Sequence, residues 1–187
     1  TIGPLCSAEY QSPGIRNEEY PELSEALKAW SEENTAAVQK EYEELLAIAR
    51  EDAGQREDFS GYSTDSSVQI VRADQKVFSF INEGYSYTGG AHGNGGTRGY
   101  SFDTETGEAL LLSDVVTDKE AFTEYLISRL EEEYASEDML FEGWQDQVRA
   151  ETGQEESLSF SLTESGMRVY FSPYEIAPWA AGTITLD

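Results

Sequence analysis

The chain has 187 residues, of which 12 are Lys or Arg and 37 are Asp or Glu, so its net charge at neutral pH is −25. This charge repels phosphate backbones and anionic lipid surfaces, which argues against nucleic acid as a partner and favours cationic partners. Aromatic residues make up 12% of the chain, too large an apolar content for a disordered acidic protein. The length fits one domain, or two small fused ones, with a packed core.

The single cysteine, Cys6, excludes an internal disulfide bond, and no His or Cys residues have the spacing of zinc ligands. We therefore predict neither a metal site nor a cofactor. No apolar run approaches the ~20 residues that a membrane-spanning helix needs. Because the chain begins with Thr1 rather than Met, we expect a signal peptide, a membrane anchor or another segment upstream of it.

The first half of the chain predicts one long helix followed by strands. Apolar residues recur every three or four positions from Leu27 to Ala49, which predicts an amphipathic helix over about 24–52 with Ser24 as its N-cap. The polar, turn-rich stretch 53–67 predicts a loop. Residues 68–112 are rich in β-branched and aromatic side chains and predict sheet, with a hairpin in 100–112 that turns at Gly107.

The second half predicts helices and then strands. Thr117 and Glu120 form a capping box that opens a helix, and a short helix follows over about 140–148. Alternating apolar residues in 158–162 and 167–171 predict a second hairpin, and a last strand lies near Ile184.

The fold class predicted by this order is α+β. We expect a largely antiparallel sheet, with the long N-terminal helix and the helix pair of the C-terminal half packed on it. We expect residues 1–187 to form a single unit, made of a helix-plus-strands segment over about 1–87 and a second segment over about 88–187.

Segment 88–99 holds six of the sixteen glycines and the single histidine, His92. A Walker loop requires Gly-Lys-Ser/Thr, and a dinucleotide fingerprint that starts at Gly93 has Arg98 in place of its last glycine. Both motifs precede a helix, whereas 100–102 predicts strand. These departures argue against nucleotide binding.

His92 admits two interpretations. An imidazole near neutral pH can serve as a general base or a metal ligand. The simpler interpretation, which we favour, is that the ring bonds a backbone carbonyl and fixes the glycine-rich loop. Neither this residue nor the many carboxylates forms a recognisable catalytic set, so we predict no catalytic residue and no enzyme.

Segment 171–182 combines two prolines with aromatic residues. Pro173 and Pro178 limit the unfolded ensemble, so the loop can present Tyr174 and Trp179 with little ordering cost on binding. The alternative is that the same aromatic residues fill the edge of the core together with Ile176. The residues leave both interpretations open.

Three segments together carry a resemblance to a known family. In order and spacing, 85–94, 102–114 and 171–182 resemble the extracellular domain of RsiV-type anti-sigma factors. Similar domains occur in secreted or lipid-anchored bacterial proteins of unknown function and beside some peptidoglycan deacetylase domains. Where relatives often have Tyr after the last Pro, this chain has Trp. The family's motif positions, which the resemblance implies are ligand-binding, are Gly89, Gly90, His92, Gly93, Pro173, Tyr174, Glu175, Pro178, Trp179 and Gly182.

The resemblance implies a noncatalytic sensor domain outside the cytoplasmic membrane, secreted or anchored to the cell surface through a segment absent from this chain. In the best-understood member the domain binds lysozyme, which exposes the anti-sigma factor to proteolysis. Lysozyme or another basic protein is therefore the expected partner, and the charge of −25 agrees with it. A second hypothesis is a module that binds or modifies peptidoglycan, with His92 and Glu175 as its acid–base pair. A purely structural domain is a third.

Overall fold

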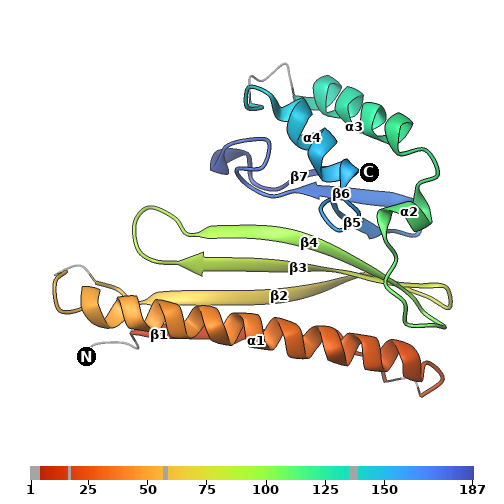
Figure 1. Ribbon diagram of the computed structural model, residues 1–187. Helices are drawn as coiled ribbons and strands as arrows, with labels where there is room; N and C mark the ends of the chain where they lie inside the picture. Colours follow the sequence, from red (N-terminus) through yellow and green to blue (C-terminus); the bar gives the residue numbers. More distant parts are fainter. Residues whose placement is uncertain (1–4, 17, 57–58, 135–138) are drawn as a thin grey trace.

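The computed structural model describes residues 5–16, 18–56, 59–134 and 139–187 (Figure 1). It is a mixed α+β fold, as the sequence predicted. The elements, in chain order, are β1 (Cys6–Tyr10), α1 (Pro21–Asp52), β2 (Tyr62–Ala73), β3 (Val77–Tyr87), β4 (Asn94–Asp103), α2 (Leu112–Val115), α3 (Lys119–Tyr134), α4 (Trp144–Gly153), β5 (Ser159–Leu162), β6 (Met167–Phe171), the 3-10 helix η2 (Trp179–Ala181) and β7 (Ile184–Leu186).

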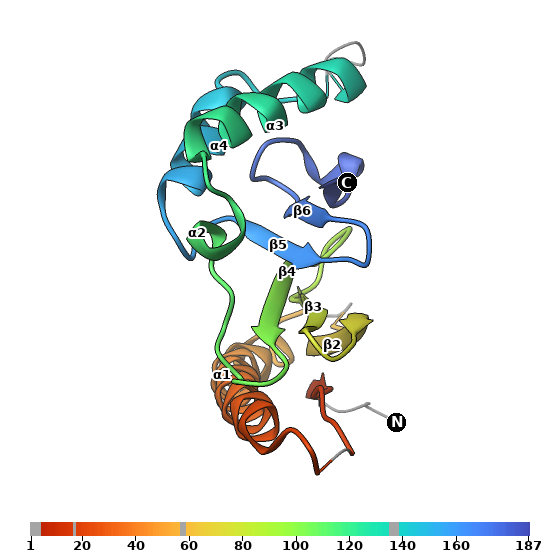
Figure 2. The ribbon, with the colours of Figure 1, turned by 90° about the vertical axis from the view of Figure 1, so that its right-hand side faces the viewer.

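These elements form four layers, seen from the side in Figure 1 and end-on in Figure 2. Helix α1 lies against a four-stranded sheet of order β1-β2-β3-β4, and a three-stranded sheet of order β5-β6-β7 follows. Helices α3 and α4 cover the second sheet. All pairings are antiparallel except β1 with β2. The division of the strands between two sheets was not visible in the sequence pattern.

Helix α1 begins three residues earlier than predicted. Tyr20 is its N-cap residue and Pro21 occupies the first turn, where its missing N–H costs nothing and its fixed φ suits the helix. Ser24 lies inside the helix, so the prediction that it caps the helix was wrong. Leu23 and Leu27 pack on three phenylalanines of β3 and β4, Phe78, Phe80 and Phe102, and form the first core cluster.

Strand β2 begins at Tyr62, within the stretch predicted as loop. Thr64 and Ser66, which face α1 in this stretch, are polar, so no hydrophobic alternation marks the start of the strand. The Thr64 hydroxyl donates to the Glu41 carboxylate at 2.5 Å, and Ser66 is bonded by Asn34 of α1 at 3.0 Å. Because these buried hydroxyls find partners on the helix, the polar strand can be buried at little cost.

The C-terminal core joins α3 and α4 to the second sheet. Leu130, Val148 and Phe171 are almost fully buried in this cluster. The N-terminal cap of α3 is Asp118, whose carboxylate accepts the N–H of Ala121 at 2.9 Å, rather than the predicted Thr117. The 158–171 hairpin is confirmed as β5 and β6.

The predicted hairpin of residues 100–112 is reduced to one bridge, between Phe102 and Ala109. Its second arm does not continue as a strand because Leu112 turns inward at the start of α2 and is fully buried. No helix within the described ranges is long and apolar enough to cross a membrane.

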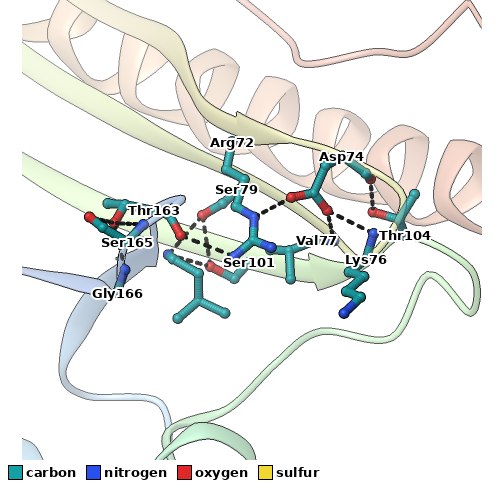
Figure 3. A network of polar contacts seen from close by, with 11 residues as sticks. Arg72, Asp74, Lys76, Val77, Ser79, Ser101, Thr104, Thr163, Ser165 and Gly166 are labelled. Carbon is teal, nitrogen blue, oxygen red and sulfur yellow. Dashed lines mark hydrogen bonds and ion pairs between the residues drawn. The ribbon is translucent and has the colours of Figure 1, made fainter.

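The two sheets meet where β5 crosses the face of β3 and β4 opposite to α1. Figure 3 shows Arg72, Ser79, Ser101 and Thr163 at this contact. The Leu162 N–H of β5 lies 3.1 Å from both Ser79 Oγ and Ser101 Oγ, and Arg72 donates to the Thr163 carbonyl at 3.0 Å. A side chain at Gly99 would place its Cβ 2.1 Å from the Phe160 carbonyl oxygen. Glycine is therefore required for the sheets to approach this closely.

Serine side chains form hydrogen bonds with the backbone groups at the outer edge of β4, which no strand covers. Ser159 Oγ accepts the Gly99 N–H and donates to the Thr97 carbonyl, both at 3.0 Å, while Ser172 Oγ accepts the Thr97 N–H at 3.0 Å. The second sheet thus closes the edge of the first through hydroxyl groups, which protects an otherwise unpaired strand.

Candidate binding site

The glycine-rich segment divides into a connection over 88–93, which holds His92, and the first residues of β4 over 94–99. Strand β4 begins at Asn94, and a Cβ at Gly93 or Gly95 would lie 2.1 Å from the Ser86 carbonyl or 2.7 Å from the Gly84 carbonyl. These glycines therefore permit close backbone pairing rather than loop mobility. Gly89 and Gly90 form the connection to β3, where φ values of 87° and 89° favour glycine.

Three aromatic rings gather around Trp179 at the β3–β4 end of the molecule, where η2 lies beside the connection between these strands (Figure 1). The His92 ring stacks on the Trp179 indole with a centroid distance of 4.6 Å and an interplanar angle of 6°. Tyr174 and Tyr85 lie 6.2 Å and 6.4 Å from the same indole. We call these four residues the aromatic cluster.

The aromatic cluster stands at the surface. Tyr174 is 53% exposed and Tyr85 is 38% exposed, and His92 is exposed as well, while Trp179 is half-buried. In contrast, Ile176 is 0% exposed and belongs to the C-terminal core. Each of the two interpretations that the sequence left open therefore applies to part of the loop. Ile176 fills the core, and Tyr174 faces solvent.

Backbone hydrogen bonds within the 171–182 loop fix its conformation. The Tyr174 N–H donates to the Ala177 carbonyl at 2.8 Å, and the Tyr174 φ of 72° lies in the left-handed region. Pro178 precedes η2, and Gly182 ends it with a φ of 67°. A loop fixed by such contacts presents its aromatic rings without further ordering on binding.

A hollow of about 540 Å³ lies beside the Trp179 indole. Its walls come from Tyr85 of β3, from Gly96 and Thr97 of β4, and from Pro173 and Gly182 of the loop. The exposed carboxylate of Glu83 lies at its rim. Aromatic rings beside a negative group are suited to an apolar or cationic group of a partner.

His92 and Glu175 occupy different surroundings. His92 Nδ1 lies 2.8 Å from the Gly93 carbonyl oxygen, the backbone contact expected from the structural interpretation. Glu175 accepts the Ser172 N–H at 2.9 Å and lines a second hollow together with Glu151. Partial loss of hydration, with a contribution from Glu151, raises the pKa of the Glu175 carboxyl. The pair is therefore not arranged around a common reacting atom.

Of the residues predicted for the site, six gather at the aromatic cluster and its hollow: His92, Gly93, Pro173, Tyr174, Trp179 and Gly182. Gly89 and Gly90 shape the strand connection, while Pro178 and Glu175 shape the loop. The sequence prediction missed Tyr85, whose hydroxyl accepts the Gly93 N–H at 2.9 Å. Its place opposite Gly95 in the β3–β4 register is the signal that would have identified it.

Metal binding has no support in the part of the chain that the structure describes, which contains no group of three or more His, Cys, Asp or Glu side chains placed to hold an ion. The site offers stacking surfaces, backbone glycines and carboxylates. This set of groups is suited to recognition.

Comparison with protein families divides the chain into two segments. Residues 3–95 match the family model described as Deacetylase PdaC, and residues 111–187 match the one described as Protein of unknown function (DUF3298). The aromatic cluster draws Tyr85 and His92 from the first segment and Tyr174 and Trp179 from the second. No curated protein matches the chain.

Two solved structures share the fold. A DUF3298 family member from Bacteroides fragilis has a TM-score of 0.65 at 21% identity, over 92% of this chain and 77% of its own. A DUF3298 family protein from Pseudomonas aeruginosa has a TM-score of 0.56 at 20% identity, over 94% of this chain and 84% of its own. At this identity the similarity establishes a common α+β fold and not a common function.

Proposed function

We propose that this chain is a noncatalytic binding or sensor domain that acts outside the cytoplasmic membrane and recognises a basic protein, with lysozyme as the first candidate. The observation that carries the proposal is the aromatic cluster: four rings from two distant segments, held by backbone hydrogen bonds and largely exposed. Exposed, rigid aromatic residues are the commonest anchors of protein interfaces.

Three further observations support the proposal. The net charge of −25 steers a basic partner toward the chain and raises its association rate at low salt. The RsiV resemblance rests on the loop and strand connection that meet at the aromatic cluster. The name of the first family model, a deacetylase, agrees with a protein of the cell wall outside the membrane.

The decisive experiment is calorimetric titration with hen-type lysozyme, beside an unrelated protein of equal positive charge. We expect stoichiometric binding of lysozyme that persists as salt is raised, because apolar contacts are less screened than charge pairs. Equal binding of both proteins, or binding that salt abolishes, would show nonspecific electrostatic attraction and overturn the proposal.

Variants locate the interface. Tyr174→Ala and Trp179→Ala are expected to weaken lysozyme binding by more than about 1 kcal/mol with little change in melting temperature, because both rings lie outside the core. Tyr10→Ala is the matched control, since Tyr10 and Tyr174 are both 53% exposed. A similar loss of affinity in all three variants would show that the aromatic cluster is not the contact surface.

Peptidoglycan recognition is the second candidate. It is favoured by the hollow beside the Trp179 ring, which can stack on a sugar, and by the deacetylase name of the first family model. Titration with muropeptides tests it, with product analysis in parallel. Binding without turnover would indicate a glycan-binding module, whereas turnover lost in His92→Ala and Glu175→Ala would indicate a modifying module.

A further inference from the structure

Another cavity lies between α1, the outer edge of β4 and the start of β5, away from the aromatic cluster. It has a volume of about 400 Å³, within the range of small-molecule sites. One wall is the α1 face that carries Trp30, and the other is formed by β4, by the segment leading to α2 and by the turn after α4. Figure 2 shows this segment passing beside α1 before it reaches α2. We call this cavity the α1 cleft.

Small residues on α1 keep the α1 cleft open. Ala26 and Ala29 share the helix face that carries Trp30, and Leu110 and Leu111 lie on the facing wall. With methyl groups at these two helix positions, the side chains do not meet across the gap. The lining is therefore mainly apolar and accepts an apolar body of limited size.

Two aromatic rings form the inner end of the α1 cleft. The Trp30 and Tyr100 rings meet edge-on at a centroid distance of 5.4 Å, and Trp30 also contacts Phe80 at 4.9 Å. These contacts fix the Trp30 indole from the core side while its other side lines the cleft. A fixed aromatic ring is suited to stack on an aromatic ligand or to face a cation.

Carboxylates surround the mouth of the α1 cleft. Glu33 follows Trp30 by one helical turn, and Glu156 lies on the facing wall. Among the described residues no cation forms an ion pair with either side chain, whereas Glu155 pairs with Lys119. Arg98 also lines the cleft and adds one positive charge, with its guanidinium held by the backbone carbonyls of Ser157 and Glu156. Glu33 and Glu156 together outweigh this charge, so the mouth carries a net negative charge.

We propose that the α1 cleft is a binding site for a small molecule that joins an aromatic or branched apolar body to one positive charge. The apolar body contacts Trp30 and the leucines, and the positive charge faces Glu33 and Glu156. This site is separate from the aromatic cluster, because its lining shares no residue with the hollow beside Trp179.

The experiment uses nuclear magnetic resonance of the three tryptophan indole N–H groups, with the Trp30 signal identified by its absence in Trp30→Phe. Two probes of equal ring and chain length are titrated separately, phenethylammonium and 3-phenylpropionate. We expect a saturable shift of the Trp30 signal with the cation, at a dissociation constant of about 1 mM for so small a ligand, and at least a several-fold weaker effect with the anion.

Matched variants distinguish binding in the cleft from attraction by the net charge of the protein. Ala29→Leu fills the cleft from an exposed helix position and is expected to abolish the Trp30 shift, whereas Ala36→Leu changes an exposed alanine outside it. Glu33→Gln is expected to weaken cation binding several-fold, whereas Glu32→Gln removes the same charge from a neighbouring position outside the lining and leaves binding unchanged.

Three results would overturn the proposal. One is the absence of a saturable Trp30 shift with either probe in the unmodified chain. Another is equal binding of phenethylammonium by Ala29→Leu and Ala36→Leu. The third is an equal loss of affinity in Glu33→Gln and Glu32→Gln, which would show attraction by the net charge alone. None of these results depends on lysozyme binding, so the two proposals fail separately.

Discussion

Tyr174 has the one positive φ angle, 72°, among the described non-glycine residues. A left-handed conformation costs a residue with a Cβ about 1 kcal/mol and is found where surrounding contacts enforce it, often at functional sites. Here the hydrogen bond from the Tyr174 N–H to Ala177 and the buried Ile176 enforce it. The conformation directs the phenol ring outward, beside Trp179.

Tyr174→Gly separates stability from binding. Glycine adopts this φ without strain, so we expect the variant to be more stable than Tyr174→Ala by about 1 kcal/mol, as measured by urea unfolding. Both variants lose the ring and are expected to lose affinity for the partner equally. A Tyr174→Gly protein that is less stable than Tyr174→Ala would show that the loop does not hold this residue under strain.

Asp74 makes the turn between β2 and β3 sensitive to acid. Its carboxylate accepts hydrogen bonds from Arg72 Nε at 2.6 Å and from the N–H groups of Lys76 and Val77, and these lower the pKa of Asp74 from 3.8 to about 2 (Figure 3). Because the folded chain binds this proton more weakly than the unfolded chain, the stability gained is complete above pH 3.8. It is lost as the pH falls through about 2.

Asp74→Asn tests this dependence. We expect the variant to be less stable than the unmodified chain at neutral pH, and the difference to shrink as the pH is lowered from about 4 toward 2. Unfolding curves at several pH values measure it, with Asp146→Asn on α4 as a control for the removal of one negative charge. A difference that stays constant over this range would contradict the assigned pKa.

At the scale of elements, the contact between β4 and β5 joins the two halves of the fold. The contact requires a missing side chain at Gly99 and hydroxyl groups at Ser159 and Ser172. These residues give no periodic signal, because they lie at a crossing of two sheets rather than along one face of a strand. Local sequence patterns therefore do not reveal the crossing.

Gly99→Ala is expected to lower the free energy of unfolding by about 3 kcal/mol, since the new Cβ would lie 2.1 Å from the Phe160 carbonyl and force the sheets apart. Gly84→Ala in β3 is the control, because a Cβ there has nothing within 4 Å. Chemical denaturation measures both variants. Equal effects of the two substitutions would show that the sheets do not require the close approach.

At the scale of the whole molecule, we propose that residues 1–187 unfold as one unit although two family models divide them. The β4 edge is completed by Ser159 of β5 and by Ser172, which follows β6, so these hydrogen bonds are lost when either half unfolds.

Two tryptophans can report on the unfolding of the two halves separately. Trp30 lies against the first core cluster, and Trp144 lies in the C-terminal core. Single-tryptophan proteins that keep Trp30 or Trp144 are expected to show coincident fluorescence transitions in urea. Two separated midpoints would instead establish two independently unfolding domains.

Local sequence patterns were enough to predict the α+β class, the long helix and the 158–171 hairpin and to argue against a nucleotide-binding loop, since each depends on local periodicity or on residues close together in the chain. The sequence also identified Tyr174 and Trp179 as residues to test. It misassigned 62–67, because the buried Thr64 and Ser66 of that strand are polar, and it treated 94–99 as part of a glycine-rich loop.

Contacts between residues far apart in the chain became known from the three-dimensional structure. It brought Tyr85 and His92 to Trp179, divided the strands between two sheets, and opened the α1 cleft beside Trp30. A periodic pattern predicts which face of an element is buried, but it does not predict which distant segment covers that face. The aromatic cluster and the cleft are both formed by such distant segments, so their existence follows from the packing of the layers and not from any one stretch of sequence.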